Sequence, residues 1–248
     1  MKTTKKVSIR FYEELNDFVR PEDCKQDIVF QLFGYPTVKD VIESFGVPHT
    51  EVDLIIVNGE SVNFDYHLKA DDHISVYPKF ESFDIKGITQ LRSEPLREVK
   101  FILDVHLGKL AKFLRLLGFD SVYKNQQDDK KIIQTAKQEK RIILTRDIGI
   151  LKHNEVTHGY YVRSDDPKKQ LGEIVQRFDL KDQVNPFTIC LECNGLLNQI
   201  HKDKITHLLD EATRKYYDTF YMCRECQKIY WKGSHYKDMI EFIKKTLK

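Results

Sequence analysis

The sequence predicts an α/β protein made of a mixed-sheet domain, a parallel-sheet domain and a small cysteine-rich module. Three observations predict it. Strand and helix patterns follow the order β-β-α-β-β early in the chain, they alternate one by one after about residue 100, and two Cys-x-x-Cys pairs lie near the end. We therefore expect domains at residues 1–80, 100–185 and 186–248, with a linker at 81–99.

The composition predicts a folded protein. With 248 residues, of which 41% are hydrophobic, the chain is long enough for one or two cores and a small module. The first residues are charged and run directly into an alternating pattern, and no apolar stretch is long enough for a signal peptide or a membrane span. We therefore expect a soluble, cytoplasmic protein that does not contact a membrane.

The charge is unevenly distributed along the chain. Residues 1–80 hold 9 Lys/Arg and 14 Asp/Glu (−5), whereas residues 81–248 hold 31 and 24 (+7). This basic excess is compatible with a polyanionic substrate, although most charge runs are simply solvated faces.

Alternating apolar and polar side chains predict the strands of the first domain. These strands are expected at residues 7–11, 28–32, 53–60 and 73–78. A helix is expected over residues 38–45, because Thr37 is suited to cap its start and Gly46 to end it. Asn58-Gly59 is a strong signal for a tight turn after the third strand.

This order of elements resembles the β-grasp, or ubiquitin-like, fold. The sequence DDHISVYP at residues 71–78 further resembles the end of the small sulfur-carrier proteins of that superfamily. Such carriers need a free C-terminal Gly-Gly, whereas this chain continues through KFESF at 79–83. Sulfur transfer is therefore disfavoured, and we expect the first domain to dock a protein partner or to act as a scaffold.

The second domain is predicted from the alternation of strands and helices. Strands are expected at residues 99–103, 120–123, 141–145 and 159–163. Helices are expected at residues 107–117, from Asp128/Asp129 onward, and at 168–178. Crossovers of ten or more residues imply a parallel sheet with helices on both faces.

The most specific chemical signal is the pair of knuckles CLECNG at 190–195 and CRECQK at 223–228. Two thiolates three positions apart can share one tetrahedral Zn²⁺, and a second pair after 29 intervening residues completes the shell. Gly195 is expected to let the backbone turn back toward the metal. We predict a structural zinc ribbon with ligands Cys190, Cys193, Cys223 and Cys226, rather than disulfides or redox cysteines. A closed shell leaves no position for substrate.

Carboxylates follow successive strands of the parallel sheet. They are Asp104, Asp129, Asp147 and Asp165. The sequence does not decide between Asp129 and its neighbour Asp128, or between Asp165 and its neighbour Asp166. The carboxyl ends of parallel strands converge on one crevice, where crowded acids can hold Mg²⁺ or Mn²⁺. For each acid alone, helix capping or solvation is the ordinary interpretation. Together they favour a metal site.

Several cations and one aromatic residue accompany these acids. The candidate nucleic-acid contacts are Lys109, Lys112, Arg115, Arg146, Arg163 and Trp231. The first three recur every three residues along one side of a helix and could receive phosphates, though a solvated face explains them about as well. Trp231 could stack on unpaired bases, and core packing beside the zinc module is its ordinary alternative.

These residues lie in sequence stretches that are similar to the PIN-like RNase family found at the C-terminus of the Mut-seven exonuclease. The matching stretches are FILDVHLGKLA at 101–111, RLLGFD at 115–120, IILTRD at 142–147, CLECNGL at 190–196 and CRECQKIYWKGSH at 223–235. Bacterial members are similar in carrying a ubiquitin-like domain in front, so the resemblance covers nearly the whole chain.

The resemblance implies a PIN-type, metal-dependent ribonuclease with an attached zinc ribbon. Its acids would be those named above, and Thr145 matches the polar residue two positions before the third acid. PIN domains often have Glu at the second acidic position, where this chain offers Asp128/Asp129. Our hypothesis is hydrolysis of single-stranded RNA with Asp104 and Asp147 as principal Mg²⁺ or Mn²⁺ ligands. The alternative is a non-catalytic RNA- or ribosome-associated adaptor.

Overall fold

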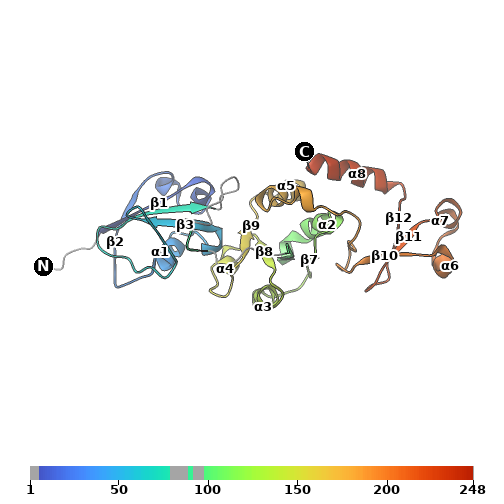
Figure 1. Cartoon of the computed structure of the whole chain (residues 1–248), viewed down its shortest axis with the longest axis horizontal. Coiled ribbons are helices and arrows are strands. Elements are labelled where there is room, and N and C mark those ends of the chain that lie inside the picture. Colours follow the sequence, from blue (N-terminus) through green and yellow to red (C-terminus); the bar gives the residue numbers. More distant parts are fainter. Residues whose placement is uncertain (1–5, 79–88, 92–97, 248) are drawn as a thin grey trace. The chain divides into compact units, whose positions relative to one another are not determined.

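The computed structural model describes residues 6–78, 89–91 and 98–247. The chain forms two compact units (Figure 1). The first comprises Met1–Glu98 together with Thr145–Tyr161, and the second comprises Val99–Leu144 together with Val162–Lys248. The predicted boundaries differ from these units in two ways. Residues 145–161 separate from the predicted domain at 100–185, and the cysteine-rich module shares a unit with the rest of that domain.

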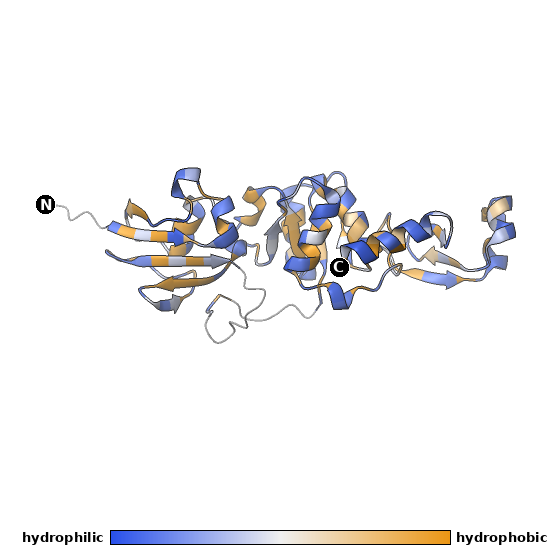
Figure 2. Cartoon of the chain, turned by 90° about the horizontal axis from the view of Figure 1, so that it is seen from above, coloured by the Kyte–Doolittle hydropathy of each residue, from blue (hydrophilic) through white to orange (hydrophobic). Residues whose placement is uncertain are grey.

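A five-stranded sheet forms most of the first unit. Its strands are β1 (Lys6–Phe11), β2 (Ile28–Gln31), β3 (Val52–Val57), β4 (Glu60–Val62) and β5 (His73–Pro78). They lie in the order β2-β1-β5-β3-β4, with β1 and β5 parallel and the other neighbours antiparallel. Hydrophobic and hydrophilic residues alternate along these strands (Figure 2), so that one set is buried in the core.

Local signals in the sequence set the bounds of this unit's elements. The helix α1 (Val38–Ser44) begins at a capping box in which Thr37 accepts from the Asp40 N–H and the Asp40 carboxylate accepts from the Thr37 N–H. Asn58 and Gly59 both have positive φ, as a tight hairpin turn between β3 and β4 requires. The predicted mixed sheet with one helix is confirmed.

The described residues of the first unit also form four shorter helices. Three are 3₁₀ helices, η1 (Glu13–Asp17), η2 (Pro21–Asp23) and η3 (His49–Glu51). The last is α4 (Ile148–Leu151), which the sequence patterns did not predict, and β9 (Gly159–Tyr161) follows it. Most of the predicted linker at 81–99 lies outside the described residues, but Thr89 and Gln90 hydrogen-bond to the backbone carbonyls of Asp53 and Ser61.

The second unit contains a parallel sheet with helices on both sides. Its elements, in chain order, are β6 (Phe101–Leu103), η4 (Val105–Leu107), α2 (Gly108–Leu116), β7 (Ser121–Val122), α3 (Asp129–Glu139), β8 (Ile142–Thr145), α5 (Pro167–Arg177) and η5 (Lys181–Gln183). β6 lies between β7 and β8 and is parallel to both. Figure 1 shows α2 and α5 on one side of these strands and α3 on the other. β6 is buried along its whole length, as a central parallel strand should be.

The cysteine-rich module follows as a three-stranded antiparallel sheet. Its strands β10 (Leu197–Ile200), β11 (Phe220–Cys223) and β12 (Ile229–Trp231) lie in that order. Its helices are α6 (Lys202–Ile205), η6 (Thr206–Leu208), α7 (Glu211–Tyr216) and α8 (His235–Thr246). The helix α8 packs on the helices of the parallel sheet, where the rings of Phe113 and Phe242 lie 4.8 Å apart. None of the helices in the described residues is both long and apolar enough to cross a membrane.

The end of α2 depends on a glycine. Gly118 has φ +93°, and its N–H and that of Phe119 donate to the carbonyls of Arg115 and Leu114 in a Schellman motif. A Cβ at this position would overlap the carbonyl oxygen of Asn185. Both the backbone conformation and the close approach therefore require glycine.

We expect Gly118→Ala to lower the free energy of unfolding by about 2 kcal/mol or more, through backbone strain and steric overlap. The matched control is Gly172→Ala in α5, where a Cβ meets nothing within 4 Å and alanine should stabilise the helix by about 0.5–1 kcal/mol. Urea denaturation of the full chain measures both changes. Equal effects of the two substitutions would contradict this account.

Candidate functional site

The four predicted metal ligands lie together. The Sγ atoms of Cys190, Cys193, Cys223 and Cys226 all lie within 4.8 Å of one another. Cys190 and Cys226 are 3.6 Å apart, and Cys193 and Cys223 are 3.3 Å apart. Because thiolates are the ligands that structural zinc prefers, the group is compatible with one Zn²⁺ held by four sulfurs.

The surroundings of Cys190 favour its thiolate form. Burial raises the pKa of Cys190, but hydrogen bonds from the Tyr230 hydroxyl and from the N–H groups of Cys193 and Glu192 outweigh it and lower this pKa to about 6. Burial and the neighbouring thiols raise the pKa of Cys193 to about 12. Four adjacent thiols cannot all ionise without a compensating cation, and a bound metal would supply that charge.

The role of Gly195 differs from the prediction. The left-handed residue of the first knuckle is Asn194, with φ 73°, so Asn194 makes the turn toward the other cysteines. Gly195 is instead required by close packing, because a Cβ there would lie 2.8 Å from Cys223 Sγ and 2.7 Å from Glu225 Cγ. The sequence pattern identified the right glycine for the wrong physical reason.

Arg115 holds the first knuckle against the parallel sheet. It is 2% exposed, and its guanidinium donates to the carbonyls of Ser121, Leu191 and Glu192 at 2.9–3.0 Å. This burial contradicts the prediction that Arg115 contacts phosphates. The three-residue spacing with Lys109 and Lys112 was misleading, because Arg115 follows the buried Ala111 by four positions and so shares its side of α2.

A second polar link joins the same knuckle to the sheet. Asp120 accepts from Arg141 at 2.7 and 3.0 Å and from the side chain of Asn194 at 2.5 Å, while Asn194 Oδ1 accepts from the Ser121 N–H. Burial raises the pKa of Asp120, but the hydrogen bonds from Arg141 and Asn194 hold it below its ordinary value. The sequence analysis did not predict this charged link, although Arg115 and Asp120 are the first and last residues of the matching stretch RLLGFD.

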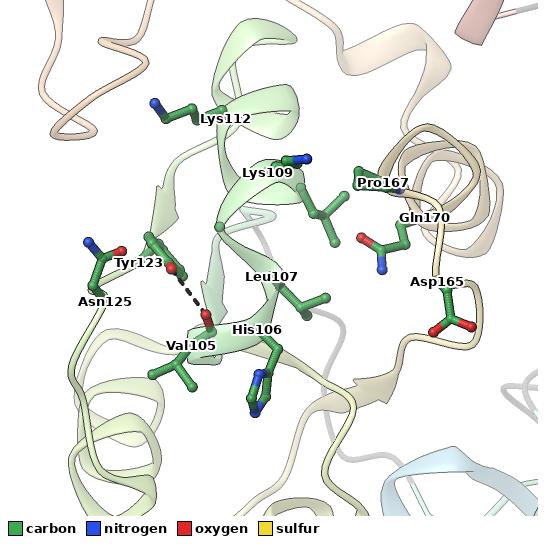
Figure 3. A pocket seen from close by; sticks show the side chains of 12 residues that line it. Val105, His106, Leu107, Lys109, Lys112, Tyr123, Asn125, Asp165, Pro167 and Gln170 are labelled. Atoms are coloured by element: carbon green, nitrogen blue, oxygen red, sulfur yellow. Dashed lines mark hydrogen bonds between the residues drawn. The ribbon is translucent and has the colours of Figure 1, made fainter.

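A pocket opens where α2 begins, just beyond the end of β6 (Figure 3). It has a volume of about 740 Å³ and is lined by Val105, His106, Leu107, Gly108, Lys109, Leu110, Lys112, Tyr123, Asn125, Asp165, Pro167 and Gln170. Gly108 lets Tyr123 approach α2, since a Cβ there would lie 2.7 Å from the tyrosine ring. The pocket thus combines two exposed lysines of α2 with one of the predicted acids.

The acids of the second unit occupy different environments. Asp104 is 3% exposed and directly follows β6; its N–H donates to the Leu144 carbonyl at 3.1 Å, and its Oδ1 accepts from the His106 N–H at 2.7 Å. Asp129 is exposed at the start of α3, and Asp165 is exposed beside the pocket. Asp104 alone of these acids is buried at a strand end.

Helix capping distinguishes the two members of each acidic pair, Asp128/Asp129 and Asp165/Asp166, between which the sequence does not decide. Asp128 caps α3 by accepting from the Lys131 N–H at 2.7 Å. Asp166 caps α5, and the backbone N–H groups of Lys169 and Lys168 lower its pKa. Asp128 and Asp166 are therefore the capping members of their pairs, and Asp165 is the member of its pair that lines the pocket.

The third acid belongs to the first unit. Asp147 is exposed; its N–H donates to Thr145 Oγ1 at 2.8 Å, and its Oδ1 accepts from the Gly149 N–H at 2.7 Å, which caps α4. Among the described residues, only the four cysteines form a group of three or more side chains placed to hold one ion. Asp104, Asp129 and Asp165, which share a unit, do not form such a group.

The remaining candidate contacts are partly exposed. Lys112 lies 3.4 Å from Glu192, Arg146 and Arg163 are half-buried, and Trp231 is 37% exposed. The rings of Tyr217 and Phe220 lie 6.5 and 6.3 Å from that of Trp231, so that core packing holds the indole while part of it faces outward.

Two family models match this chain. The Mut7-C RNAse domain model matches residues 99–243, which is more than half of the 248 residues, and the Mut7-C ubiquitin model matches residues 4–84. The chain belongs to the Mut7-C RNAse domain family. The comparisons with curated proteins and with solved structures find no significant match.

Membership of the Mut7-C family confirms the resemblance drawn from the sequence. The matched ranges include the pocket, the predicted acids and all four cysteines, and the family indicates a ribonuclease-type function. They also confirm a ubiquitin-like domain in front of the RNase domain.

We expect the Mut7-C chain to bind one zinc ion, and Cys223→Ser to abolish this binding and lower the melting temperature, since the site is held by four thiolates. Metal analysis by mass spectrometry together with thermal unfolding measures both effects. The matched control is Cys24→Ser, because Cys24 lies in the first unit, apart from the four ligands. Equal zinc content in the two variants would contradict the assignment.

Arg115→Ala should lower the free energy of unfolding by about 3 kcal/mol, because it removes three hydrogen bonds from a buried guanidinium, one buried and two partly buried. Lys112→Ala, on an exposed part of the same helix, should change it by less than about 1 kcal/mol. Denaturant unfolding of zinc-loaded protein compares the two variants. A larger effect at Lys112 would show that Arg115 does not secure the knuckle.

Proposed function

We propose that this Mut7-C chain is a PIN-type, metal-dependent ribonuclease that hydrolyses phosphodiester bonds in single-stranded RNA. The observation that carries the proposal is the pocket at the end of β6, which joins Asp165, Lys109 and Lys112 beside the buried Asp104. In parallel α/β sheets, ligands bind beyond the carboxyl ends of the strands, where the strand order changes direction. Here β6 is that point, because the chain passes from it first to β7 and then across to β8.

Asp104 and Asp147 are the proposed principal ligands of Mg²⁺ or Mn²⁺. Asp104 follows β6, and Asp147 follows the neighbouring strand β8 by two residues. The donor chemistry fits, since carboxylate oxygens are hard ligands, and Mg²⁺ commonly keeps several waters and uses only one or two protein carboxylates. Such an ion, when bound, supplies an activated water and stabilises charge on the phosphate. Asp129 and Asp165 do not gather with Asp104 around one ion, so their proposed role is to orient the attacking water.

The chain's own residues would bind and orient the RNA. Lys109 and Lys112 are exposed on α2 at the pocket, where they attract phosphate oxygens (Figure 3). Arg146 and Arg163 are further candidates for the phosphate backbone. The exposed part of Trp231 is suited to stacking on an unpaired base, which favours single-stranded substrate.

A second candidate function is a non-catalytic RNA- or ribosome-associated adaptor. The arrangement of Asp104, Asp129 and Asp165 favours it, because these three do not gather as ligands of one ion. In this alternative the zinc-binding module and the lysines bind RNA, and the ubiquitin-like domain recruits a protein partner. An adaptor would bind RNA equally well with and without Mn²⁺ and would leave it intact, which calorimetric titration and gel analysis measure.

The ribonuclease proposal predicts that Asp104→Asn and Asp147→Asn each lower the rate of Mn²⁺-dependent cleavage by at least about 100-fold, because each removes a charged metal ligand. Incubation with labelled single-stranded RNA measures the rate. Asp128→Asn and Asp166→Asn are matched controls, since asparagine also caps helices and should leave the rate unchanged. Undiminished cleavage by both ligand variants would contradict the proposed site.

A further inference from the structure

The segment Thr145–Tyr161, here called the α4–β9 segment, belongs to the same compact unit as the ubiquitin-like domain, although it is inserted in the sequence of the RNase domain. It begins with the turn that carries Asp147. Its helix α4 has only four residues, and helices of that length are not stable alone. The conformation around Asp147 therefore depends on what holds the segment.

A buried histidine of the ubiquitin-like domain contacts the middle of the segment. His49 is 8% exposed; its Nε2 lies 2.8 Å from the Val156 carbonyl oxygen and its Nδ1 lies 2.6 Å from Glu43 Oε1. The Val156 carbonyl can only accept, so Nε2 donates to it, and Nδ1 shares a hydrogen bond with the Glu43 carboxyl group. His49 thus connects α1, through Glu43, to the backbone of the α4–β9 segment.

A buried carboxylate holds the end of the segment. Glu51 is 1% exposed, and its Oε1 accepts from the Tyr161 N–H at 2.7 Å. The ring of Tyr161 also packs edge-on against Phe18 at 5.4 Å. His49 and Glu51 are the two ends of η3, so one 3₁₀ helix of the ubiquitin-like domain supplies both buried contacts to the segment's backbone.

Two lysine contacts lie between these points and Asp147. Lys152 Nζ donates to the Glu43 carbonyl at 2.7 Å, near the C-terminal end of α1, where a cation is favourable. Lys39 Nζ donates to Asn154 Oδ1 at 3.0 Å. The ubiquitin-like domain therefore holds the segment at four positions that begin five residues after Asp147.

We propose that the ubiquitin-like domain is a structural part of the nuclease, in which His49 and Glu51 are positioning residues that fix the α4–β9 segment and thereby the Asp147 carboxylate. The inference rests on the proposed function, because it gives Asp147 its role as a metal ligand. It assigns the η3 surface of this domain to a contact within the chain. An external protein partner would therefore have to use another surface.

The test compares three variants of the full chain. His49→Ala removes the contacts to Val156 and Glu43, and His49→Gln keeps an amide donor that can reach a carbonyl. The matched control is His73→Ala, since His73 is exposed on β5 and bonds to Ser8 on the neighbouring strand β1. Hydrogen–deuterium exchange of residues 145–161 and the affinity for Mn²⁺ are measured for each, with circular dichroism to verify the fold.

We expect His49→Ala to speed exchange across residues 145–161 and to weaken Mn²⁺ binding by about 10-fold, as loss of an outer support of a metal ligand does. His49→Gln should restore part of both, and His73→Ala should change neither. If His49→Ala does not fold, the double variant Lys39→Ala/Lys152→Ala serves instead, because both lysines contact the segment through their ammonium groups.

Unchanged exchange in His49→Ala would overturn the inference, as would faster exchange with unchanged Mn²⁺ affinity. Neither measurement requires cleavage of RNA. A wild-type chain that binds Mn²⁺ but cleaves no RNA would therefore contradict the proposed ribonuclease function alone, and the response of Mn²⁺ affinity to the His49 variants would still decide whether the domain positions Asp147.

Discussion

The parallel pairing of β6 with both its neighbours is the constraint on which the candidate site depends. β6 has three residues, all buried, and the chain leaves it at Asp104, whose N–H bonds to the Leu144 carbonyl of β8. This hydrogen bond keeps the ends of the two strands in register. Asp104 is buried where β6 ends, α2 then begins at Gly108 with its lysines at the pocket, and β8 ends at Thr145, two residues before Asp147 in the sequence.

Strands this short need support from outside the sheet, and separate parts of the chain supply it. In the second unit, Arg115 and Asp120 fasten the first cysteine knuckle to α2 and to the loop before β7. In the first unit, η3 of the ubiquitin-like domain holds the α4–β9 segment. Arg115, His49 and Glu51 bond to backbone groups of the segments they support, whereas Asp120 bonds to the side chain of Asn194. The cysteine-rich module thus supports the sheet of its own unit, and the ubiquitin-like domain supports the α4–β9 segment within the first unit.

Much of this arrangement follows from local sequence signals, and the remainder depends on tertiary contacts. Thr37 caps the start of α1 and Asn58-Gly59 forms a tight turn, and both effects are local in the sequence. The spacing of the four cysteines likewise predicts that they lie together. Arg115 has the same charge as Lys109 and Lys112, so its charge alone could not show that it is buried. The carbonyl groups that it contacts belong to residues 121, 191 and 192, which no local pattern connects to it. The helix α4 gave no periodic signal in four residues, and its association with residues more than 90 positions earlier is invisible to any local pattern.

The central claim is that Asp104 and Asp147 share a hard cation. A crystal structure of the full chain grown in Mn²⁺, with anomalous scattering recorded to locate the ion, tests it most directly. The account predicts a manganese peak that is coordinated by carboxylate oxygens of both residues. Manganese bound elsewhere, with the carboxylates of Asp104 and Asp147 too far apart to reach one ion, would contradict it.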